Sequence, residues 1–252
     1  MDTKRLSMWS CPRTVSTALM RSFAQRADTT CVDEPFYAHY LSATGKQHPM
    51  REEVLAALPQ DWRDVVTQTL LAPCAKPVQF VKHMAHHLEG GVETDFALDD
   101  TMINLFLIRH PREMLPSLLS DLGHLEAMDM GYERQVELFR RLKAAGRCTA
   151  VVDSTELLAD PEAMLREICA AVGLEFDPAM MQWPAGRHES YGVWAPAWYA
   201  KVETSTGWRK HVPKTADFPS ELESLLPVAL AAYEELYAAA LHPRGHSPQT
   251  KS

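Results

Sequence analysis

Short apolar runs alternate with longer amphipathic segments along the chain, and this alternation predicts the fold. Ile103–Ile108 is the clearest run, since near-continuous apolar residues are typical of a strand buried on both faces of a parallel sheet. In Tyr132–Ala145, by contrast, Val136, Phe139 and Leu142 share one helical face. We therefore predict a three-layer α/β fold with a parallel central sheet flanked by helices. The predicted strands are Arg5–Trp9, Thr29–Val32, Val78–Val81, Ile103–Ile108 and Thr149–Asp153.

Residues with capping chemistry mark the predicted helix boundaries. Gly146 is a typical stop signal, and Asp160 followed by Pro161 is a typical start. The stretch Ser42–Pro77 is polar and carries no recognisable chemistry, so we interpret it as a covering element. The predicted helices are Ser16–Arg26, Arg51–Leu58, Asp61–Leu71, Tyr132–Ala145, Pro161–Val172 and Ser220–Leu241.

The first predicted strand leads through a tight polar loop directly into the first helix. This order points the unpaired N–H groups of the first helical turn, and the positive end of its dipole, toward the loop. Arg13 adds a guanidinium group, and Ser16 and Thr17 add hydroxyl donors, so the loop has the chemistry of a phosphate or sulfate site. The alternative is an ordinary helix cap, in which Ser16 or Thr17 satisfies its own backbone and Arg13 lies in solvent. No Gly-x-x-x-x-Gly-Lys pattern is present, which disfavours an ordinary nucleoside triphosphatase.

The next two strands also end in polar residues, at the edge where open α/β sheets bind ligands. Asp33 and Glu34 follow the second strand, where Glu34 is either functional or a solvated loop acid. Lys82 and His83 follow the third strand and can exchange protons near neutral pH. His83 and His87 have the i, i+4 spacing that places two metal ligands on one helical face, but no third ligand lies nearby, so we predict no metal site.

The last two strands add a basic side chain, Arg109, and an acidic one, Asp153, to this edge. Arg109 follows the fourth strand, and Ser117 stands in the helix that Pro111 starts, so both can reach one ligand; alone, Arg109 is equally consistent with a surface salt bridge. Asp153 ends the fifth strand like the acid of a Walker B site, which supports a kinase interpretation. We favour the alternative, in which this carboxylate caps a helix or sits at the sheet edge.

An aromatic-rich stretch follows, from Trp183 to Trp208, and it is either a hydrophobic lid or acceptor wall, or packing that anchors a long loop. A compact basic cluster ends it, formed by Arg209, Lys210 and His211.

Composition limits the partners. The chain has 252 residues, 46% of them hydrophobic, and a net charge of -8, which argues against nucleic acid or an anionic membrane as a partner. Its five cysteines are scattered and odd in number, which is typical of reduced thiols in a cytoplasmic protein, and there is no secretory signal and no apolar run long enough to span a bilayer. We expect one domain over 1–252, with a flexible tail at 242–252.

Taken together, three motifs resemble the sulfotransferase family that uses 3'-phosphoadenosine 5'-phosphosulfate (PAPS), in the form seen in bacterial members. Pro12-Arg13-Thr14-Val15-Ser16-Thr17 resembles the family's 5'-phosphosulfate loop, Pro-Lys/Arg-Ser-Gly-Thr/Ser-Thr. Arg109-His110-Pro111 with Ser117 resembles the 3'-phosphate motif, and Trp208-Arg209-Lys210 resembles the C-terminal basic segment that closes over the nucleotide. Glu156–Pro161 also resembles the family's connection from the fifth strand to the next helix.

The resemblance implies a P-loop nucleoside-triphosphate-hydrolase-like fold and transfer of a sulfuryl group from PAPS to a hydroxyl or amine of a small acceptor, with adenosine 3',5'-bisphosphate (PAP) as product. It implies no requirement for magnesium, since the sulfuryl group carries less charge than a γ-phosphoryl group. The implied donor contacts come from the loop, the strand-end pair and the basic segment: Arg13, Thr14, Val15, Ser16, Thr17, Arg109, Ser117, Trp208, Arg209 and Lys210.

Family members supply the general base either from a His after the third strand or from a Glu after the second. Lys82 matches the third-strand Lys and would act with Arg13 on the transferred group, but Met84 stands where the His would be. Glu34 matches the second-strand alternative, so it is our first candidate, with His83 in reserve and His86 displaced from the register.

Two departures from the family pattern affect the donor site. Val15 stands where the loop usually has Gly, which implies ordinary backbone angles there. Ala18 stands where many members have a Trp that stacks on adenine, so the base would pack elsewhere, for example on Trp208. Both departures leave the identity of the nucleotide open. Two alternatives to the sulfotransferase also stay open: a metal-dependent kinase, which Asp153 at a strand end supports, and a nucleotide-binding protein without catalysis, which Met84 and Val15 support.

Overall fold

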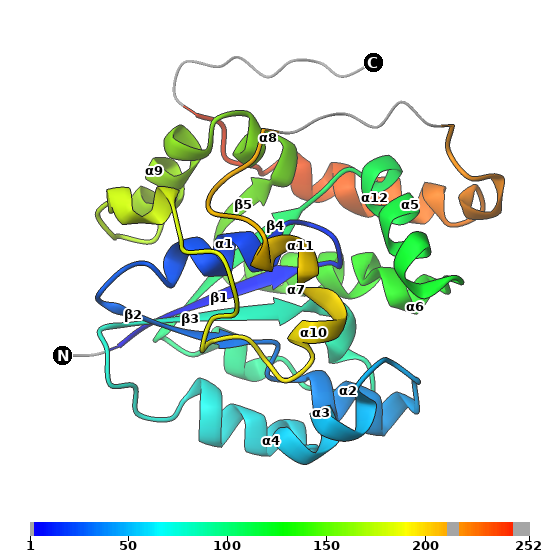
Figure 1. The fold of residues 1–252 in the computed structure, drawn as a ribbon, viewed down its shortest axis with the longest axis horizontal. Helices are drawn as coiled ribbons and strands as arrows, with labels where there is room; N and C mark the ends of the chain where they lie inside the picture. The colour runs from blue at the N-terminus through cyan, green and yellow to red at the C-terminus, as the bar shows by residue number, and fades with distance from the viewer. Residues whose placement is uncertain (1–2, 211–216, 244–252) are drawn as a thin grey trace.

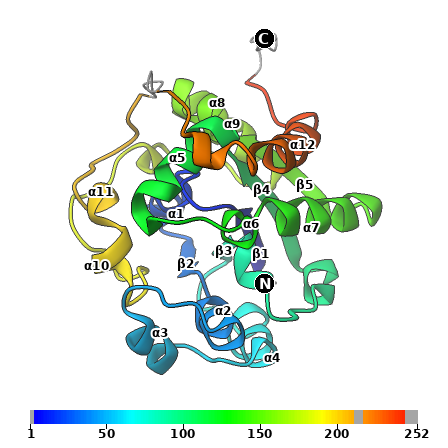
Figure 2. The same ribbon diagram turned by 90° about the vertical axis from the view of Figure 1, so that its right-hand side faces the viewer.

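All five predicted strands are present and form one parallel sheet in the order β2-β3-β1-β4-β5. The structure is a computed structural model that describes residues 3–210 and 217–243. Helices cover both faces of the sheet (Figures 1 and 2), so the predicted three-layer α/β fold is confirmed. The strands are β1 (Lys4–Ser10), β2 (Thr29–Asp33), β3 (Val78–Met84), β4 (Met102–Ile108) and β5 (Cys148–Asp153).

The sheet separates two hydrophobic cores because alternate residues of each strand point to opposite faces. On one face α1 and α9 pack against residues such as Leu6 and Phe80. On the other face α5, α7 and α12 pack against residues such as Val81 and Phe106. The helices are α1 (Ser16–Phe23), α2 (Tyr37–Thr44), α3 (Arg51–Ala57), α4 (Trp62–Val65), α5 (Pro111–Leu122), α6 (Ala127–Met130), α7 (Tyr132–Ala144), α8 (Ser154–Ala159), α9 (Pro161–Ala171), α10 (Ala195–Trp198), α11 (Ala200–Glu203) and α12 (Leu226–Tyr237).

The short helices α6, α8, α10 and α11 were not predicted, and three further helical segments differ from the sequence prediction. Tyr37–Thr44 forms a helix that we did not predict, ended by Gly45 in the left-handed conformation. The segment predicted as Asp61–Leu71 is α4 followed by a π-helical turn, Val66–Leu70.

The predicted helix Ser220–Leu241 is the third difference, because only Leu226–Tyr237 is α-helical and a 3-10 turn, Ser220–Leu222, precedes it. Pro227 explains the late start, since a proline ring is tolerated only in the first turn of a helix. Most of the expected tail 242–252 lies outside the described residues, as does His211.

The carboxyl ends of the strands meet at one edge of the sheet, where polar side chains hold them in register. Gln135 of α7 is fully buried and donates two hydrogen bonds of 3.0 Å, one to the Trp9 carbonyl of β1 and one to the Leu107 carbonyl of β4. Ser154 at the start of α8 bonds the carbonyls of Thr14 and Ile108, each at 2.7 Å. The loop after β1 is therefore fastened to the end of β4.

None of the helices in the described ranges combines the length and apolar character needed to cross a membrane.

Candidate active site

The loop between β1 and α1 has an unusual backbone. Val15 caps α1 with φ 60° and ψ 20°, and Arg13 also has φ 60°. Our expectation of ordinary angles at Val15 is therefore wrong, since this valine adopts the left-handed conformation that favours glycine. The loop tolerates this because its carbonyls are tied down: the hydroxyl of Thr14 donates to Cys11 O at 2.9 Å, and Ser154 donates to Thr14 O.

The alternative of an ordinary helix cap does not match the geometry. No side-chain hydrogen bond caps α1, so Ser16 and Thr17 do not satisfy the first turn. Arg13 is not in solvent either. Its Nε lies 3.1 Å from the hydroxyl of Ser117, and its Nη1 lies 3.1 Å from a carboxylate oxygen of Asp121, both on α5.

Arg109, at the end of β4, connects directly to the same loop. Its Nη1 donates to the Arg13 carbonyl at 2.8 Å, and its Nε lies 3.2 Å from a carboxylate oxygen of Glu113. Tyr132 of α7 donates to the Arg109 carbonyl at 2.7 Å. The two predicted anion motifs therefore meet, and each arginine is already paired with a carboxylate of α5.

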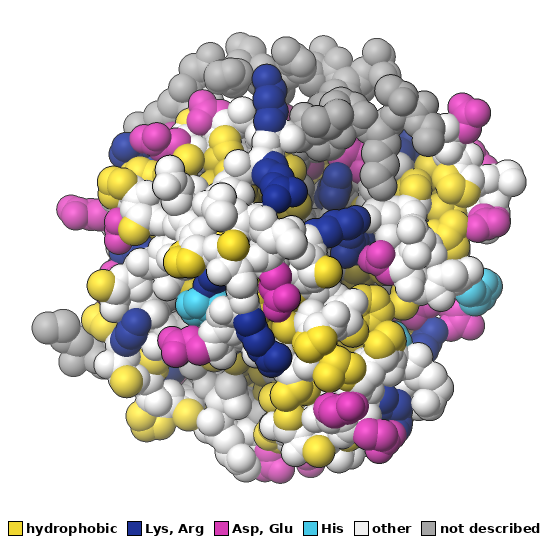
Figure 3. Space-filling model, viewed as in Figure 1, with side chains coloured by type: hydrophobic (Ala, Val, Ile, Leu, Met, Phe, Trp, Pro, Cys, Tyr) yellow, Lys and Arg dark blue, Asp and Glu magenta, His cyan; other side chains and the backbone are white. Residues whose placement is uncertain are grey.

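A cavity of about 500 Å³ lies over this edge of the sheet. Figure 3 shows several Lys and Arg side chains near the middle of one face of the molecule. The cavity brings together every predicted site residue except His83, namely Arg13, Thr14, Val15, Ser16, Thr17, Glu34, Lys82, Arg109, Ser117, Trp208, Arg209 and Lys210.

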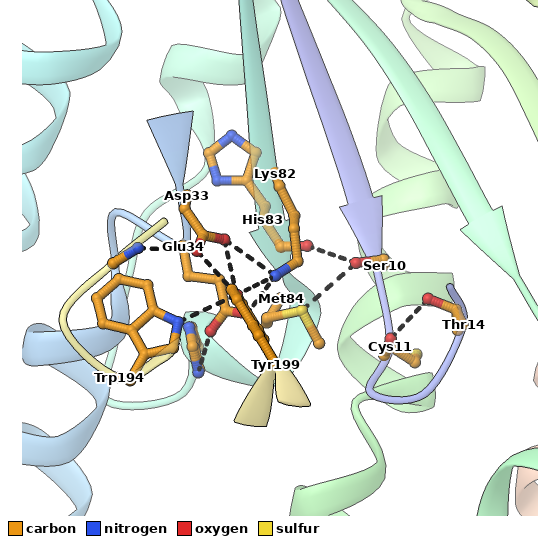
Figure 4. Close-up of polar contacts among 12 residues, drawn as sticks. Ser10, Cys11, Thr14, Asp33, Glu34, Lys82, His83, Met84, Trp194 and Tyr199 are labelled. Carbon is orange, nitrogen blue, oxygen red and sulfur yellow. Dashed lines mark hydrogen bonds and ion pairs between the residues drawn. The ribbon is translucent and has the colours of Figure 1, made fainter. Parts of the chain in front are cut away.

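A buried polar cluster forms one wall of the cavity (Figure 4). The Lys82 Nζ lies 2.9 Å from Asp33 Oδ1, 2.6 Å from Glu34 Oε1 and 2.6 Å from the hydroxyl of Tyr199. Glu34 has φ 40° and its N–H donates to the Lys82 carbonyl at 2.9 Å, which turns its side chain toward the ammonium. Two carboxylates thus share one cation.

Burial and charge shift the proton affinities of this cluster. Burial raises the pKa of Glu34, and the charge of Asp33 raises it further, while Lys82 opposes both effects. Burial disfavours the ammonium of Lys82, but the two carboxylates outweigh burial and hold its pKa above the ordinary value. Glu34 is thus a stronger base than an exposed carboxylate.

His83 lies on the opposite face of β3 from Lys82. Its ring stacks on Trp9 with centroids 4.0 Å apart, its Nε2 is 3.4 Å from the Ser7 hydroxyl, and burial lowers its pKa to about 3. The expectation that Lys82 and His83 follow the third strand is wrong, because β3 continues to Met84 and successive side chains alternate between faces. His83 therefore does not reach the cavity.

The two other histidines near β3 do line the cavity. His86 and His87 lie in a 3-10 turn, Ala85–Leu88, so His83 and His87 do not share a helical face. Burial lowers the pKa of His86 to about 3 and that of His87 well below its ordinary value. Within the described ranges, no three His, Cys, Asp or Glu side chains are grouped closely enough to hold a metal ion.

The aromatic-rich stretch contributes both to the cavity and to the core. Trp183, Trp198, Tyr199 and Trp208 line the cavity, whereas Trp194 is almost fully buried in the core. Trp208 donates its indole N–H to Met180 O at 3.2 Å and meets Trp183 edge-on.

Arg209 and Lys210 follow Trp208 at the edge of the described residues. Both line the cavity, and Arg209 lies 3.3 Å from the Thr204 carbonyl.

Sequence reasoning missed the roles of Asp33, Tyr199 and Ser154. Asp33 was visible only as a neighbour of Glu34, and Tyr199 only as one of several aromatic residues. Nothing in the local sequence indicated that Tyr199 reaches Asp33 and Lys82, since 117 residues separate Tyr199 from Lys82. Apart from the position of Ser154 directly after Asp153, nothing in the sequence indicated that its hydroxyl contacts the loop after β1 and the end of β4.

The Sulfotransferase domain profile matches residues 4–240, and the chain belongs to this family. Two curated proteins of Arabidopsis thaliana are similar to it. They are named branched-chain-amino-acid aminotransferase-like proteins 1 and 2, and they are 36% and 34% identical over 93% and 90% of this chain. The matched regions cover only 42% and 40% of those proteins, so this chain spans less than half their length.

Solved structures share the fold at low sequence identity. The sulfotransferase domain of the Synechococcus PCC 7002 olefin synthase has a TM-score of 0.54 at 16% identity, covering 95% of this chain and 96% of that chain. A sulfotransferase from Alicyclobacillus acidocaldarius has a TM-score of 0.53 at 12% identity, with 96% and 98% covered. Mouse sulfotransferase SULT7A1, solved in complex with PAP, has a TM-score of 0.53 at 11% identity, with 94% and 90% covered.

The left-handed backbone conformation of Val15 can be tested by its effect on stability. We expect Val15→Gly to change the free energy of unfolding by less than about 1 kcal/mol, because relief of the left-handed strain, roughly 1–2 kcal/mol, offsets the lost side chain and the added chain entropy. The matched control is Val32→Gly in β2, which we expect to lower the free energy by about 2–4 kcal/mol. Urea unfolding of both variants measures this, and an equal loss at the two sites would contradict the strain.

Proposed function

We propose that this chain transfers a sulfuryl group from PAPS to a hydroxyl or amine of a small acceptor, leaving PAP. One observation carries the proposal: two arginine sites at the ends of β1 and β4 share a cavity with a buried carboxylate–lysine pair. A donor with anions at both ends needs two basic sites, and transfer to a hydroxyl or amine needs a base beside them.

The donor would lie across the loop and α5. The 5'-phosphosulfate fits the N–H groups at the start of α1 together with Arg13, Ser16 and Thr17. The 3'-phosphate fits Arg109 and Ser117. Trp208, Arg209 and Lys210 line the same cavity and would close over the nucleotide.

In the transfer step the acceptor oxygen or nitrogen bonds to sulfur while the bond between sulfur and the 5'-phosphate oxygen breaks. The proton of the acceptor passes to Glu34, whose raised pKa suits a general base. Lys82 and Arg13 provide positive charge for the transferred group and the departing phosphate. Fixed cations in a largely buried site need little reorganisation at that moment, so they stabilise the transition state well.

The kinase alternative has less support. Asp153 is fully buried and accepts hydrogen bonds from the N–H groups of Thr155 and Glu156 and from the hydroxyl of Tyr233. It acts as the helix cap that we favoured, and a carboxylate engaged in this way is not available to a metal–nucleotide complex. The proposal of a binding protein without catalysis rested on Val15 and Met84, and Glu34 provides a base that needs no His at position 84.

The donor can be tested by ligand-dependent stability. We expect PAP to raise the melting temperature of the purified protein, with a stabilisation of about 2.7 kcal/mol at ~100 times its dissociation constant, because the bisphosphate occupies both arginine sites. ATP with magnesium is the comparison, and AMP controls for the nucleoside and a single phosphate. Stabilisation by ATP with magnesium but not by PAP would refute the proposal.

The base can be tested with Glu34→Gln. We expect sulfuryl transfer from PAPS to fall by about 10²–10⁴-fold, because the amide cannot accept the proton, while the affinity for PAP stays the same. In the unchanged protein the rate should fall on the acid side, at a pH above the ordinary range of a glutamate, since protonated Glu34 is inactive and its pKa is raised. Glu89→Gln, which lies outside the cavity lining, is the control, and full activity of Glu34→Gln would assign the base elsewhere.

Because Asp121 pairs with Arg13, we expect removal of the Asp121 charge to raise the affinity of the protein for PAP. We expect Asp121→Asn to bind PAP about three- to tenfold more tightly, on the order of 1 kcal/mol, because the nucleotide no longer displaces a carboxylate from the guanidinium. Titration calorimetry with PAP measures this. Glu137→Gln, an exposed change of the same charge, is the control, and weaker binding by Asp121→Asn would show that the carboxylate helps the ligand.

A further inference from the structure

The segment 192–205 packs over the polar cluster and is connected to it by hydrogen bonds. It contains α10 and α11, with Tyr199 between them. The Gly192 N–H donates to Asp33 Oδ2 at 3.1 Å, and the Trp194 indole N–H donates to the Tyr199 hydroxyl at 3.1 Å. Figure 4 shows Trp194 and Tyr199 beside Asp33, Glu34 and Lys82.

The Tyr199 hydroxyl is fully used within this cluster. An aromatic hydroxyl has one proton to donate and can accept hydrogen bonds. Its oxygen lies 2.6 Å from the Lys82 ammonium and near the Trp194 N–H, which both donate to it. Its proton points to Asp33, with distances of 2.8 Å and 3.0 Å to the two oxygens, and Glu34 Oε1 is 3.2 Å away.

All three N–H donors of the Lys82 ammonium also have acceptors within the cluster. An ammonium has three N–H donors, and Lys82 has three acceptors within 2.9 Å, supplied by Asp33, Glu34 and Tyr199. Without Asp33 and Tyr199 the ammonium would have only Glu34 to accept its hydrogen bonds. Both residues therefore fix where Lys82 lies and how strongly it pairs with Glu34.

Packing alone does not explain the hydroxyl of Tyr199. Tyr191, near the same segment, is also buried, and its ring lies 5.1 Å from that of Tyr199. Yet the Tyr191 hydroxyl has no hydrogen-bond partner among the described residues. The fold therefore buries a tyrosine ring here without needing a polar contact.

We propose that Asp33 and Tyr199 are positioning residues that hold Lys82 against Glu34 and set the base strength of Glu34 in opposite directions. This inference rests on the proposed function, since it takes Glu34 as the base. Asp33 places a second negative charge beside Glu34 and so favours its protonated form, whereas the Tyr199 hydroxyl donates its proton to Asp33 and so offsets part of that charge.

Glu34 is surrounded by groups from five parts of the chain. Oε2 lies 4.0 Å from His87 Nε2, and burial keeps this imidazole neutral, so it adds no charge. The directions of the pKa shifts agree with the geometry, since Asp33 raises the pKa of Glu34 while Tyr199 and Lys82 lower it. The ionisable groups that face Glu34 are Asp33, Tyr37, Lys82, His87 and Tyr199.

The test uses Asp33→Asn, Tyr199→Phe and the matched control Tyr191→Phe, each as a complex with PAP. The protonation of Glu34 is followed by carbon-13 NMR of glutamate-labelled protein, with Glu34→Gln used to assign the signal. We expect the titration midpoint to fall by about one pH unit or more in Asp33→Asn, which removes a neighbouring charge. We expect it to rise by about half a unit in Tyr199→Phe, which removes the hydroxyl proton that offsets the charge of Asp33, and to stay unchanged in Tyr191→Phe.

Shifts of opposite sign separate a positioning role from a merely structural one. Loss of packing alone would lower the melting temperature of both variants without moving the midpoint in two directions. Unchanged midpoints, or shifts of the same sign, in folded Asp33→Asn and Tyr199→Phe would overturn the inference. Because this measurement needs no acceptor, it is independent of the proposed reaction: full transferase activity of Glu34→Gln would refute the base assignment even if the midpoints shift as expected.

Discussion

A buried ammonium shared by two carboxylates is the interaction on which the site depends. Lys82 is almost completely removed from solvent, and its charge is tolerable only because Asp33 and Glu34 surround it. These contacts join β2, β3 and the segment that carries Tyr199. The same cluster that satisfies a structural requirement of the fold therefore also positions the group that we propose as the base.

The edge of the sheet gives this cluster its neighbours. Because the five strands are parallel, the loop after β1, the acids at the end of β2, Lys82 of β3 and Arg109 after β4 all lie at one end of the sheet. Gln135 of α7 and Ser154 of α8 hold the ends of β1 and β4 together, because each forms hydrogen bonds to carbonyls at or after the ends of both strands. One side of the cavity is thus built at strand ends that buried polar side chains hold together.

The sequence was sufficient for the sheet because apolar runs such as Ile103–Ile108 can only be buried strands in this context. It also located the loop at Arg13 and the acid at Glu34. The prediction that His83 could serve as the base was not supported, because β3 extends to Met84 rather than ending at Val81. Inside the strand, His83 points to the opposite face of the sheet from Lys82.

Long-range contacts and unusual backbone angles also could not be predicted from the sequence. Tyr199 meets Lys82 only through the tertiary fold, and the left-handed angle of Val15 is imposed by contacts of the loop rather than by valine itself.

The acids of α5 would also affect the kinetics of the proposed reaction. Asp121 and Glu113 pair with the guanidinium groups of Arg13 and Arg109. Departure of a nucleotide bound to these arginines would therefore leave neither without a partner, since a carboxylate of α5 would replace each lost phosphate contact. An exchange of this kind would lower the barrier to product release, so the helix that we propose to complete the donor site would also favour release of the product.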